Sequence, residues 1–274
     1  MDAGHFIAFG FLALLLQYLF ASYGNLKSTA LSFVVCAVLI ITIEVIQPYV
    51  GRMASLGDVV NGFLGLIIFL SGRYIWLSSK RSYIKYLHAL LGTLVFAAVV
   101  SAALSEWHAV WWRMQNFPML GDFEENVELK LWRAQGEAAG IQTPVSLSSD
   151  YVVFGISALK IETAQGVWSG VRYAAGDKDW SAYNALIMDI YNPGTSFSIY
   201  LRIDDDRGSP DYPERFNRAI PLSNGWNNIE IALADVADGP QDSMLNMHAI
   251  HKLILFTSKE EIDRTFYLDH VHLQ

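Results

Sequence analysis

Long apolar runs separated by short polar segments are the feature that most limits how this chain can fold. Four such runs come before residue 105, at residues 5–23, 28–47, 56–77 and 83–104. About 20 apolar residues are enough for a helix to cross the hydrocarbon core of a bilayer. A helix also satisfies its own backbone polar groups, which lipid requires. We therefore predict a transmembrane bundle of four helices over residues 1–104.

The second half of the chain has a different pattern. Residues 197–204, FSIYLRID, alternate between apolar and polar side chains, which is typical of a strand with one buried face. Similar runs occur at residues 158–163, 185–192, 227–236, 252–258 and 265–273, separated by turn sequences. These runs predict an all-β sandwich over residues 117–274. Residues 105–116 are then expected to form an interfacial linker between the two domains.

Basic residues predict the orientation of the helices. They gather in two of the loops between the apolar runs: Lys27 in the first loop, and Arg73, Lys80, Arg81 and Lys85 around the third. Loops rich in lysine and arginine stay in the cytoplasm. We therefore expect the N-terminus and the C-terminal domain to be extracytoplasmic. The tryptophans that follow the last run are expected to form an aromatic belt at the outer interface: Trp107, Trp111 and Trp112.

Polar residues lie near the outer ends of the first three predicted helices. Six of them form a candidate site: His5, Glu44, Gln47, Arg52, Asp58 and Asn61. Ionisable groups in membrane helices are costly, so they usually turn inward and find partners. We expect a polar cluster in which Glu44 or Asp58 pairs with Arg52, and in which small Gly62 and Gly65 let a neighbouring helix approach. The alternative is that these residues only cap helices or meet lipid headgroups. His88, near the cytoplasmic end, is expected to be structural.

These residues resemble the VanZ-like family. The matching motifs are D-x-x-H-F-x-x-F from Asp2, E-x-x-Q from Glu44, and G-R-x-A-S-x-x-D-V-x-x-N-x-x-G from Gly51. The resemblance covers about residues 2–77 and implies a bacterial inner-membrane protein of the cell envelope, of the group named for teicoplanin resistance. The family usually has a lysine after the first aspartate, whereas this chain has Ala3.

The C-terminal half resembles the galactose-binding-like jelly roll of carbohydrate-binding modules. The residues that carry this resemblance are FPMLGDFEEN (117–126), GISALKIET (155–163), WSAYNALIMDIYN (180–192), YPERFNRAIPLSNGWNNIEIALADV (212–236) and FYLDHVHL (266–273). It implies a glycan-binding role and a structural calcium, for which Glu124 and Asp269 are the matching carboxylates. Oxygen ligands of this kind suit calcium, although a surface acid is the alternative. A shift in the apolar alternation near Asp269 predicts a β-bulge there.

Aromatic and planar polar side chains are the candidates for sugar contact, because rings stack on pyranose faces and planar groups bind hydroxyls. The candidates are Trp168, Trp180, Tyr183, Tyr212 and Trp226 for stacking, and Arg202, Asp204, Asp206 and Arg215 for polar contacts. Most tryptophans in a domain of this size belong to the core, so we expect two of the five rings to be exposed. The pairs His248 and His251, and His270 and His272, have spacings that could bind metal, with solvated histidines as the alternative.

Composition excludes several classes of function. The net charge is −8 and no basic run is present, so we expect no nucleic-acid partner. A single cysteine, Cys36, excludes a disulfide framework and a thiolate zinc site. The expected partners are membrane lipid and a glycan or lipid-linked glycan.

Two hypotheses of function remain. The favoured one is a non-catalytic envelope protein whose sandwich binds glycan, because the sequence contains no nucleophile motif, phosphate loop or zinc signature. The other is an integral-membrane enzyme that acts on a lipid-linked sugar or sugar phosphate. In that enzyme Glu44 or Asp58 would be the general base, His5 its acid-base partner and Arg52 a clamp for phosphate.

Overall fold

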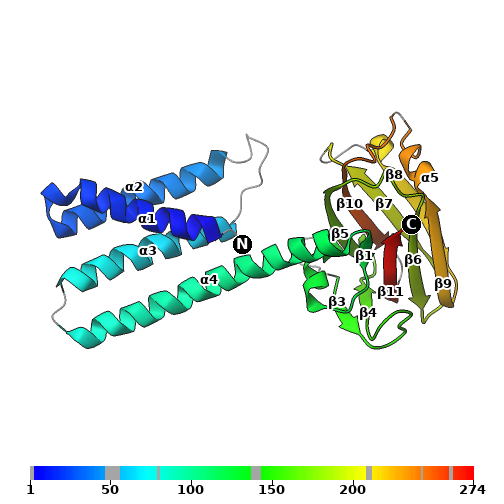
Figure 1. Cartoon of the computed structure of the whole chain (residues 1–274), viewed down its shortest axis with the longest axis horizontal. Coiled ribbons are helices and arrows are strands. Elements are labelled where there is room, and N and C mark those ends of the chain that lie inside the picture. Colours follow the sequence, from blue (N-terminus) through cyan, green and yellow to red (C-terminus); the bar gives the residue numbers. More distant parts are fainter. Residues whose placement is uncertain are drawn as a thin grey trace. The chain divides into compact units, whose positions relative to one another are not determined.

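The chain divides into two compact units, Met1–Trp107 and His108–Gln274 (Figure 1). The computed structural model describes residues 3–46, 56–78, 81–136, 143–207, 212–241, 243–258 and 262–274.

The first unit is helical, as the apolar runs predicted. It contains α1 (Ala3–Leu19), the short 3₁₀ helix η1 (Ala21–Tyr23), α2 (Asn25–Ile46), α3 (Leu56–Ser78) and the larger part of α4 (Ser82–Asn116). Three of these, α2, α3 and α4, are long and apolar enough to cross a membrane, and α1 is a shorter apolar helix. Large apolar side chains point outward from every one of them, as in Leu15, Val38 and Leu94, which are each more than half exposed.

Close packing of α1 against α3 depends on glycine. A Cβ atom on Gly65 would collide with the backbone carbonyl of Phe6, and one on Gly62 would come within 3.1 Å of the Ile40 side chain. Small residues let membrane helices approach closely, as expected for these two glycines. A small core forms between the helices around Phe9, Ile40 and Leu66.

The second unit is a sandwich of two antiparallel sheets. The six-stranded sheet has the order β3 (Val145–Ser148), β4 (Ala158–Thr163), β11 (Arg264–Leu273), β6 (Ala185–Asn192) and β9 (Gly225–Ala232), with β1 (Met119–Gly121) also paired to β11. The five-stranded sheet has the order β2 (Trp132–Gly136), β5 (Ser169–Lys178), β10 (Ile250–Thr257), β7 (Phe197–Asp205) and β8 (Phe216–Leu222). One apolar core fills the space between the sheets.

Two details of the strands confirm the sequence analysis. On β7 the side chains of Phe197, Ile199, Leu201 and Ile203 are buried, while those between them are partly exposed. On β11 the register against β6 shifts between Asp269 and His272, and His270 has a φ of 49°. The predicted bulge is therefore present.

The helices of the described chain differ from the prediction in number and in length. Five α-helices are present rather than four, because α5 (Leu233–Ala237) is a short helix inside the sandwich unit. Residues 105–116, expected to be an interfacial linker, are the last turns of α4. In these turns Ala109 and Trp112 are buried in the sandwich core. Core packing therefore extends the helix beyond the apolar run.

Trp112 corrects the predicted aromatic belt. It is only 4% exposed, whereas Trp107 and Trp111 are 65% and 48% exposed. Its indole N–H donates to Glu125 Oε1 at 3.2 Å. One residue further on, the guanidinium of Arg113 donates to the Ala174 carbonyl at 2.6 Å. Trp112 is thus part of the sandwich core and is not exposed like Trp107 and Trp111.

Glu128 is a fully buried acid in the 3₁₀ helix η3 (Asn126–Lys130). Its carboxylate accepts the backbone N–H groups of Asp122, at 3.1 Å, and Glu125, at 3.3 Å. Burial nevertheless raises the pKa of Glu128, and with the contribution of the nearby Asp122 carboxylate the pKa rises from 4.5 to about 8. The group is therefore protonated in the folded state at neutral pH.

Glu128 predicts a pH-dependent stability. A folded-state pKa above the unfolded value stabilises the fold fully below about pH 4.5, and this contribution is lost as the pH rises through about 8. We expect the free energy of unfolding to fall by a few kcal/mol over that range, and Glu128→Gln to remove most of this slope. Urea unfolding of the full chain in detergent across this range measures it. The exposed Glu230→Gln change is the control, and an equal slope in the wild type and Glu128→Gln would contradict the assignment.

Candidate functional site

A groove crosses the outer face of the five-stranded sheet. Its volume is about 400 Å³, and its lining comes from four strands and two adjoining turns: Gln135, Trp168, Arg202, Arg215, Asn217, Ile254 and Phe256. We call the cavity lined by these seven residues the groove. Three of the candidates from the sequence, Trp168, Arg202 and Arg215, meet here.

Strand register builds the floor of the groove. On β7 and β10 the directly opposed pairs are Tyr200 with Phe256, Arg202 with Ile254, and Asp204 with Lys252. Successive side chains of a strand point to opposite faces, so these pairs share one face at two-residue steps. Asn217 on β8 stands opposite Arg202 and extends the same row. The groove therefore follows from the pairing of three strands.

An ion pair with Asp204 holds the Arg202 side chain in place. The buried Asp204 accepts two hydrogen bonds from the Arg202 guanidinium, at 2.7 and 2.6 Å, and Lys252 Nζ lies 3.1 Å from the same carboxylate. A bidentate arginine–carboxylate pair is strong and geometrically specific. The Asp204 carboxylate thus binds both Arg202 and Lys252. This pairing holds the Arg202 guanidinium in one orientation beside the groove.

Aromatic rings form the apolar side of the groove. Trp168 is 38% exposed and lies 5.6 Å from Phe256 and 6.2 Å from Tyr200, measured between ring centroids. Tyr200 stacks on Phe256 with an interplanar angle of 22°. A half-exposed ring beside guanidinium and amide donors offers both an apolar face and hydrogen bonds. Sugar rings require this combination.

The other ring candidates lie elsewhere. Trp180 is fully buried in the core, so its ring is not available to a glycan and the expectation for it was wrong. Tyr183 packs against the core and makes an edge contact with Phe117 at 5.5 Å. Tyr212 begins the 3₁₀ helix η4 (Tyr212–Glu214), and its side chain lies outside the described structure. Asp206 is exposed and accepts a hydrogen bond from the Asn246 amide at 3.3 Å.

Trp226 belongs to a second aromatic row, on the six-stranded sheet. It is 45% exposed and pairs in register with Tyr191, which in turn pairs with Tyr267. Tyr151 stacks on Tyr191 with centroids 3.8 Å apart. These rings contact one another, whereas Trp168 lines the groove. Trp226 is therefore a suitable control for Trp168.

The predicted calcium residues hold a loop. Glu124 Oε1 accepts the N–H groups of Ile156 and Ser157, at 2.8 and 3.0 Å. Asp269 Oδ2 accepts those of Val153 and Phe154, at 2.7 and 3.0 Å. Burial raises the pKa of Asp269, although these hydrogen bonds lower it. These hydrogen bonds tie residues 153–157 to the two carboxylates. Calcium binding stays a prediction.

Loss of the Asp269 carboxylate should loosen this loop. In asparagine an NH₂ group replaces one of the two carboxylate oxygens, so one acceptor for the backbone N–H groups is lost. We expect Asp269→Asn to lower the free energy of unfolding by about 1–3 kcal/mol, and the exposed Glu230→Gln to change it little. Urea unfolding in calcium and in EGTA measures this. The loss is expected in both buffers. A loss confined to the calcium buffer would show that the ion, not the amides, is the main partner.

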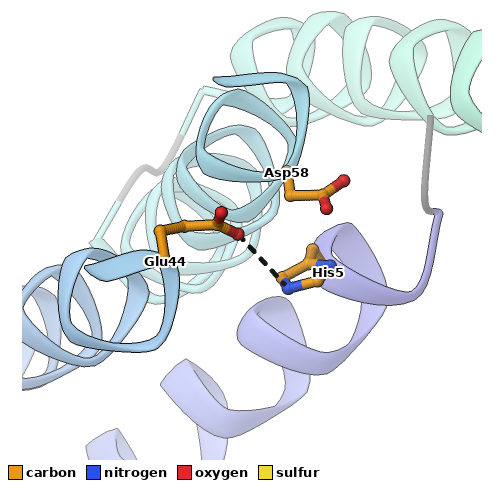
Figure 2. Close-up of side chains that lie close together, drawn as sticks. All are labelled: His5, Glu44 and Asp58. Atoms are coloured by element: carbon orange, nitrogen blue, oxygen red, sulfur yellow. Dashed lines mark ion pairs between the residues drawn. The ribbon is translucent and has the colours of Figure 1, made fainter. Parts of the chain in front are cut away.

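The helical unit contains a second group of chemical interest, drawn in Figure 2. His5 of α1, Glu44 of α2 and Asp58 of α3 each place one nitrogen or oxygen atom within 4.8 Å of the other two. His5 Nε2 and Glu44 Oε1 are 3.8 Å apart. We call these three residues the polar cluster. Three of the six predicted residues therefore converge.

The remaining members of the predicted set have different outcomes. Asn61 is 3% exposed and lies one turn after Asp58 on α3. Gln47 and Arg52 lie outside the described residues, so the predicted pairing with Arg52 stays a prediction. His88 contacts the Ile68 carbonyl oxygen at 3.1 Å, which is a structural contact between α4 and α3.

The other histidines do not join larger ligand groups within the described part of the chain. His248 lies 3.1 Å from the Asp179 carboxylate, on the surface. His270 and His272 have ring centroids 4.3 Å apart, and His270 Nδ1 lies 3.6 Å from Asp189. Among the described residues, the polar cluster is the one group of three or more side chains with the spacing of a metal site.

Sequence reasoning missed four groove residues: Gln135, Asn217, Ile254 and Phe256. It also missed Tyr200, which stacks on Phe256. For Tyr200 a signal existed, because the alternation of residues 197–204 places it on the same face as Arg202. For Phe256 and Asn217 the signal was weaker, since the order of the strands in the sheet was needed to bring them next to Arg202.

An antiparallel two-sheet sandwich with a groove of rings and planar polar groups on one sheet defines a carbohydrate-binding type of domain. The family described as "Carbohydrate binding domain (family 11)" matches residues 115–253, about half of the chain. The chain belongs to this family. The match does not reach α1, α2 or α3, so the VanZ-like resemblance stays a prediction.

Several solved structures are similar to the sandwich. One is a family 11 carbohydrate-binding module from Clostridium thermocellum in complex with a β-1,3-1,4-mixed-linked tetrasaccharide, with 20% identity and a TM-score of 0.46 over 57% of this chain and 93% of that one. An exo-β-agarase has 19% identity and a TM-score of 0.44, over 57% of this chain and 24% of that one. A xylan-binding domain from Paenibacillus barcinonensis Xyn10C has 16% identity and a TM-score of 0.40, over 56% and 90%. No curated protein matches the chain.

Proposed function

We propose that the protein is a membrane-anchored glycan-binding protein. Its apolar helices hold it in the bacterial cytoplasmic membrane, and its sandwich binds envelope glycan, or the glycan of a lipid-linked cell-wall component, on the outer side. The observation that carries the proposal is the groove, where the half-exposed Trp168 ring stands beside an Arg202 guanidinium fixed by Asp204. Family membership supports the same conclusion.

The groove is suited to a glycan in two ways. The rings of Trp168 and Phe256 can pack on the apolar C–H face of a pyranose. Arg202, Arg215, Asn217 and Gln135 supply planar donors and acceptors for hydroxyl groups along the same cavity. Binding sites for small molecules combine an apolar lining with a few placed polar groups in this way.

The proposed location rests on the helices and on the charge pattern. Three helices have the length and apolarity of membrane spans. The basic residues between the apolar runs favour an extracytoplasmic C-terminal domain, and the VanZ-like motifs are typical of an envelope protein. A structural calcium ion near Glu124 and Asp269 is part of the same proposal and rests on the jelly-roll resemblance alone.

A second candidate function is favoured by the polar cluster. Imidazole and carboxylate groups at one place in a helical membrane domain can move protons. An enzyme acting on a lipid-linked sugar phosphate would use Glu44 or Asp58 as base and His5 as its partner, with Arg52 as a phosphate clamp. Turnover of such a substrate by the full chain, lost in Glu44→Gln, would favour the enzyme over the binding protein.

The groove predicts which tryptophan matters for binding. We expect Trp168→Ala to weaken the binding of a mixed-linked β-glucan at least tenfold, about 1.4 kcal/mol, because it removes the ring beside the cavity. Trp226→Ala, which removes a slightly more exposed tryptophan from the other sheet, should leave the affinity unchanged. Isothermal titration of the full chain in detergent measures both. A larger loss in Trp226→Ala would move the site to the six-stranded sheet, and an absence of binding to any glycan on an array would refute the proposed function.

A further inference from the structure

The polar cluster has the composition of a metal site. It offers one imidazole nitrogen from His5 and carboxylate oxygens from Glu44 and Asp58, and each residue belongs to a different helix. Figure 2 shows the three side chains close together, with the ion pair between His5 and Glu44 as a dashed line. The match to the carbohydrate-binding family begins at residue 115, so it does not include these three residues.

The distances are close to those that a metal requires. Zinc binds imidazole nitrogen and carboxylate oxygen at about 2.0–2.2 Å, which places neighbouring ligand atoms of a tetrahedron about 3.3–3.5 Å apart. His5 Nε2 and Glu44 Oε1 are 3.8 Å apart, and all three ligand atoms lie within 4.8 Å of one another. Side-chain shifts of about 1 Å or less, within the freedom of rotamers, would complete the geometry.

Helix packing holds the ligands in place. Gly65 brings the backbones of α3 and α1 into contact at Phe6, the residue next to His5. Gly62 lets α3 pack against Ile40, one turn before Glu44. The three ligands therefore stand on helices whose spacing is already set, and a preformed site costs less ordering on binding.

Charge also favours a divalent ion. Glu44 is only 7% exposed, and Asp58 lies beside it in an apolar helical unit. Two carboxylates so close repel each other, more strongly where water is scarce. A divalent cation neutralises both and binds the imidazole as well. Mixed nitrogen and oxygen donors suit zinc better than magnesium or calcium, which prefer oxygen alone.

We propose that His5, Glu44 and Asp58 bind one divalent cation, and that zinc fits this donor set best. Three protein ligands leave a coordination position for water or a substrate oxygen, as in catalytic zinc sites. The proposal is independent of glycan binding by the sandwich.

The test uses the full chain in detergent. The protein is stripped with EDTA, incubated with zinc chloride and desalted, and zinc is counted per chain by mass spectrometry. Competition with a chromogenic chelator then gives the dissociation constant. We expect one zinc ion per chain in the wild type, and at least about tenfold weaker binding in His5→Gln, Glu44→Gln and Asp58→Asn. Matched controls make the same chemical changes outside the cluster: His108→Gln and Glu106→Gln.

Two further measurements keep the result decisive. If a cluster variant does not fold, as judged by circular dichroism, cobalt(II) is added to the wild type. Its visible absorption reports a tetrahedral nitrogen and oxygen site, and zinc should abolish this absorption.

The Arg52 guanidinium is a cation that could compete with the metal for the carboxylates. We therefore expect Arg52→Gln to bind zinc at least as tightly as the wild type. Binding that appears only in Arg52→Gln would overturn the proposal. So would equal affinity in all variants, or no zinc and no cobalt signal in the wild type. Glycan affinity measured in the same His5→Gln protein should be unchanged.

Discussion

The buried carboxylate of Asp204 is the interaction on which the groove depends. It is fully buried in the sandwich and binds both Arg202 and Lys252. A buried charge is tolerated only when it is paired and hydrogen-bonded, so the two cations cannot leave it. Because the three residues belong to two paired strands, the strand register sets the position of the guanidinium relative to Phe256. The adjoining turns add Trp168 and Arg215 to the groove.

The helical unit is organised by a different constraint, which is contact between backbones. Gly65 against Phe6 leaves no room for a side chain between α1 and α3. This contact lies close to His5 along α1, and Asp58 is two turns away on α3. Close packing therefore brings one imidazole and two carboxyl groups from three helices together. In both units, helices or strands hold the polar side chains in position.

Much of this arrangement could be predicted from particular residues. The apolar runs predicted four helices, and the alternation of residues 197–204 predicted β7 with Arg202 and Asp204 on one face. The spacing of His5, Glu44 and Asp58 near predicted helix ends indicated the polar cluster. Trp180 and Trp168 could not be told apart, because local sequence does not show which face of a sandwich a turn residue meets. The extension of α4 to Asn116 was missed, since it depends on Ala109 and Trp112 packing against strands far along the chain.

The central claim is that glycan binds across β7, β8 and β10, beside Trp168. Hydrogen–deuterium exchange of the full chain, with and without a glycan that it binds on an array, tests it most directly, because backbone protection reports the bound surface without any substitution. The account predicts slower exchange in Phe197–Asp205, Phe216–Leu222, Ile250–Thr257 and the turn that carries Trp168. Slower exchange confined to Ala185–Asn192 and Gly225–Ala232, around Tyr191 and Trp226, would contradict it.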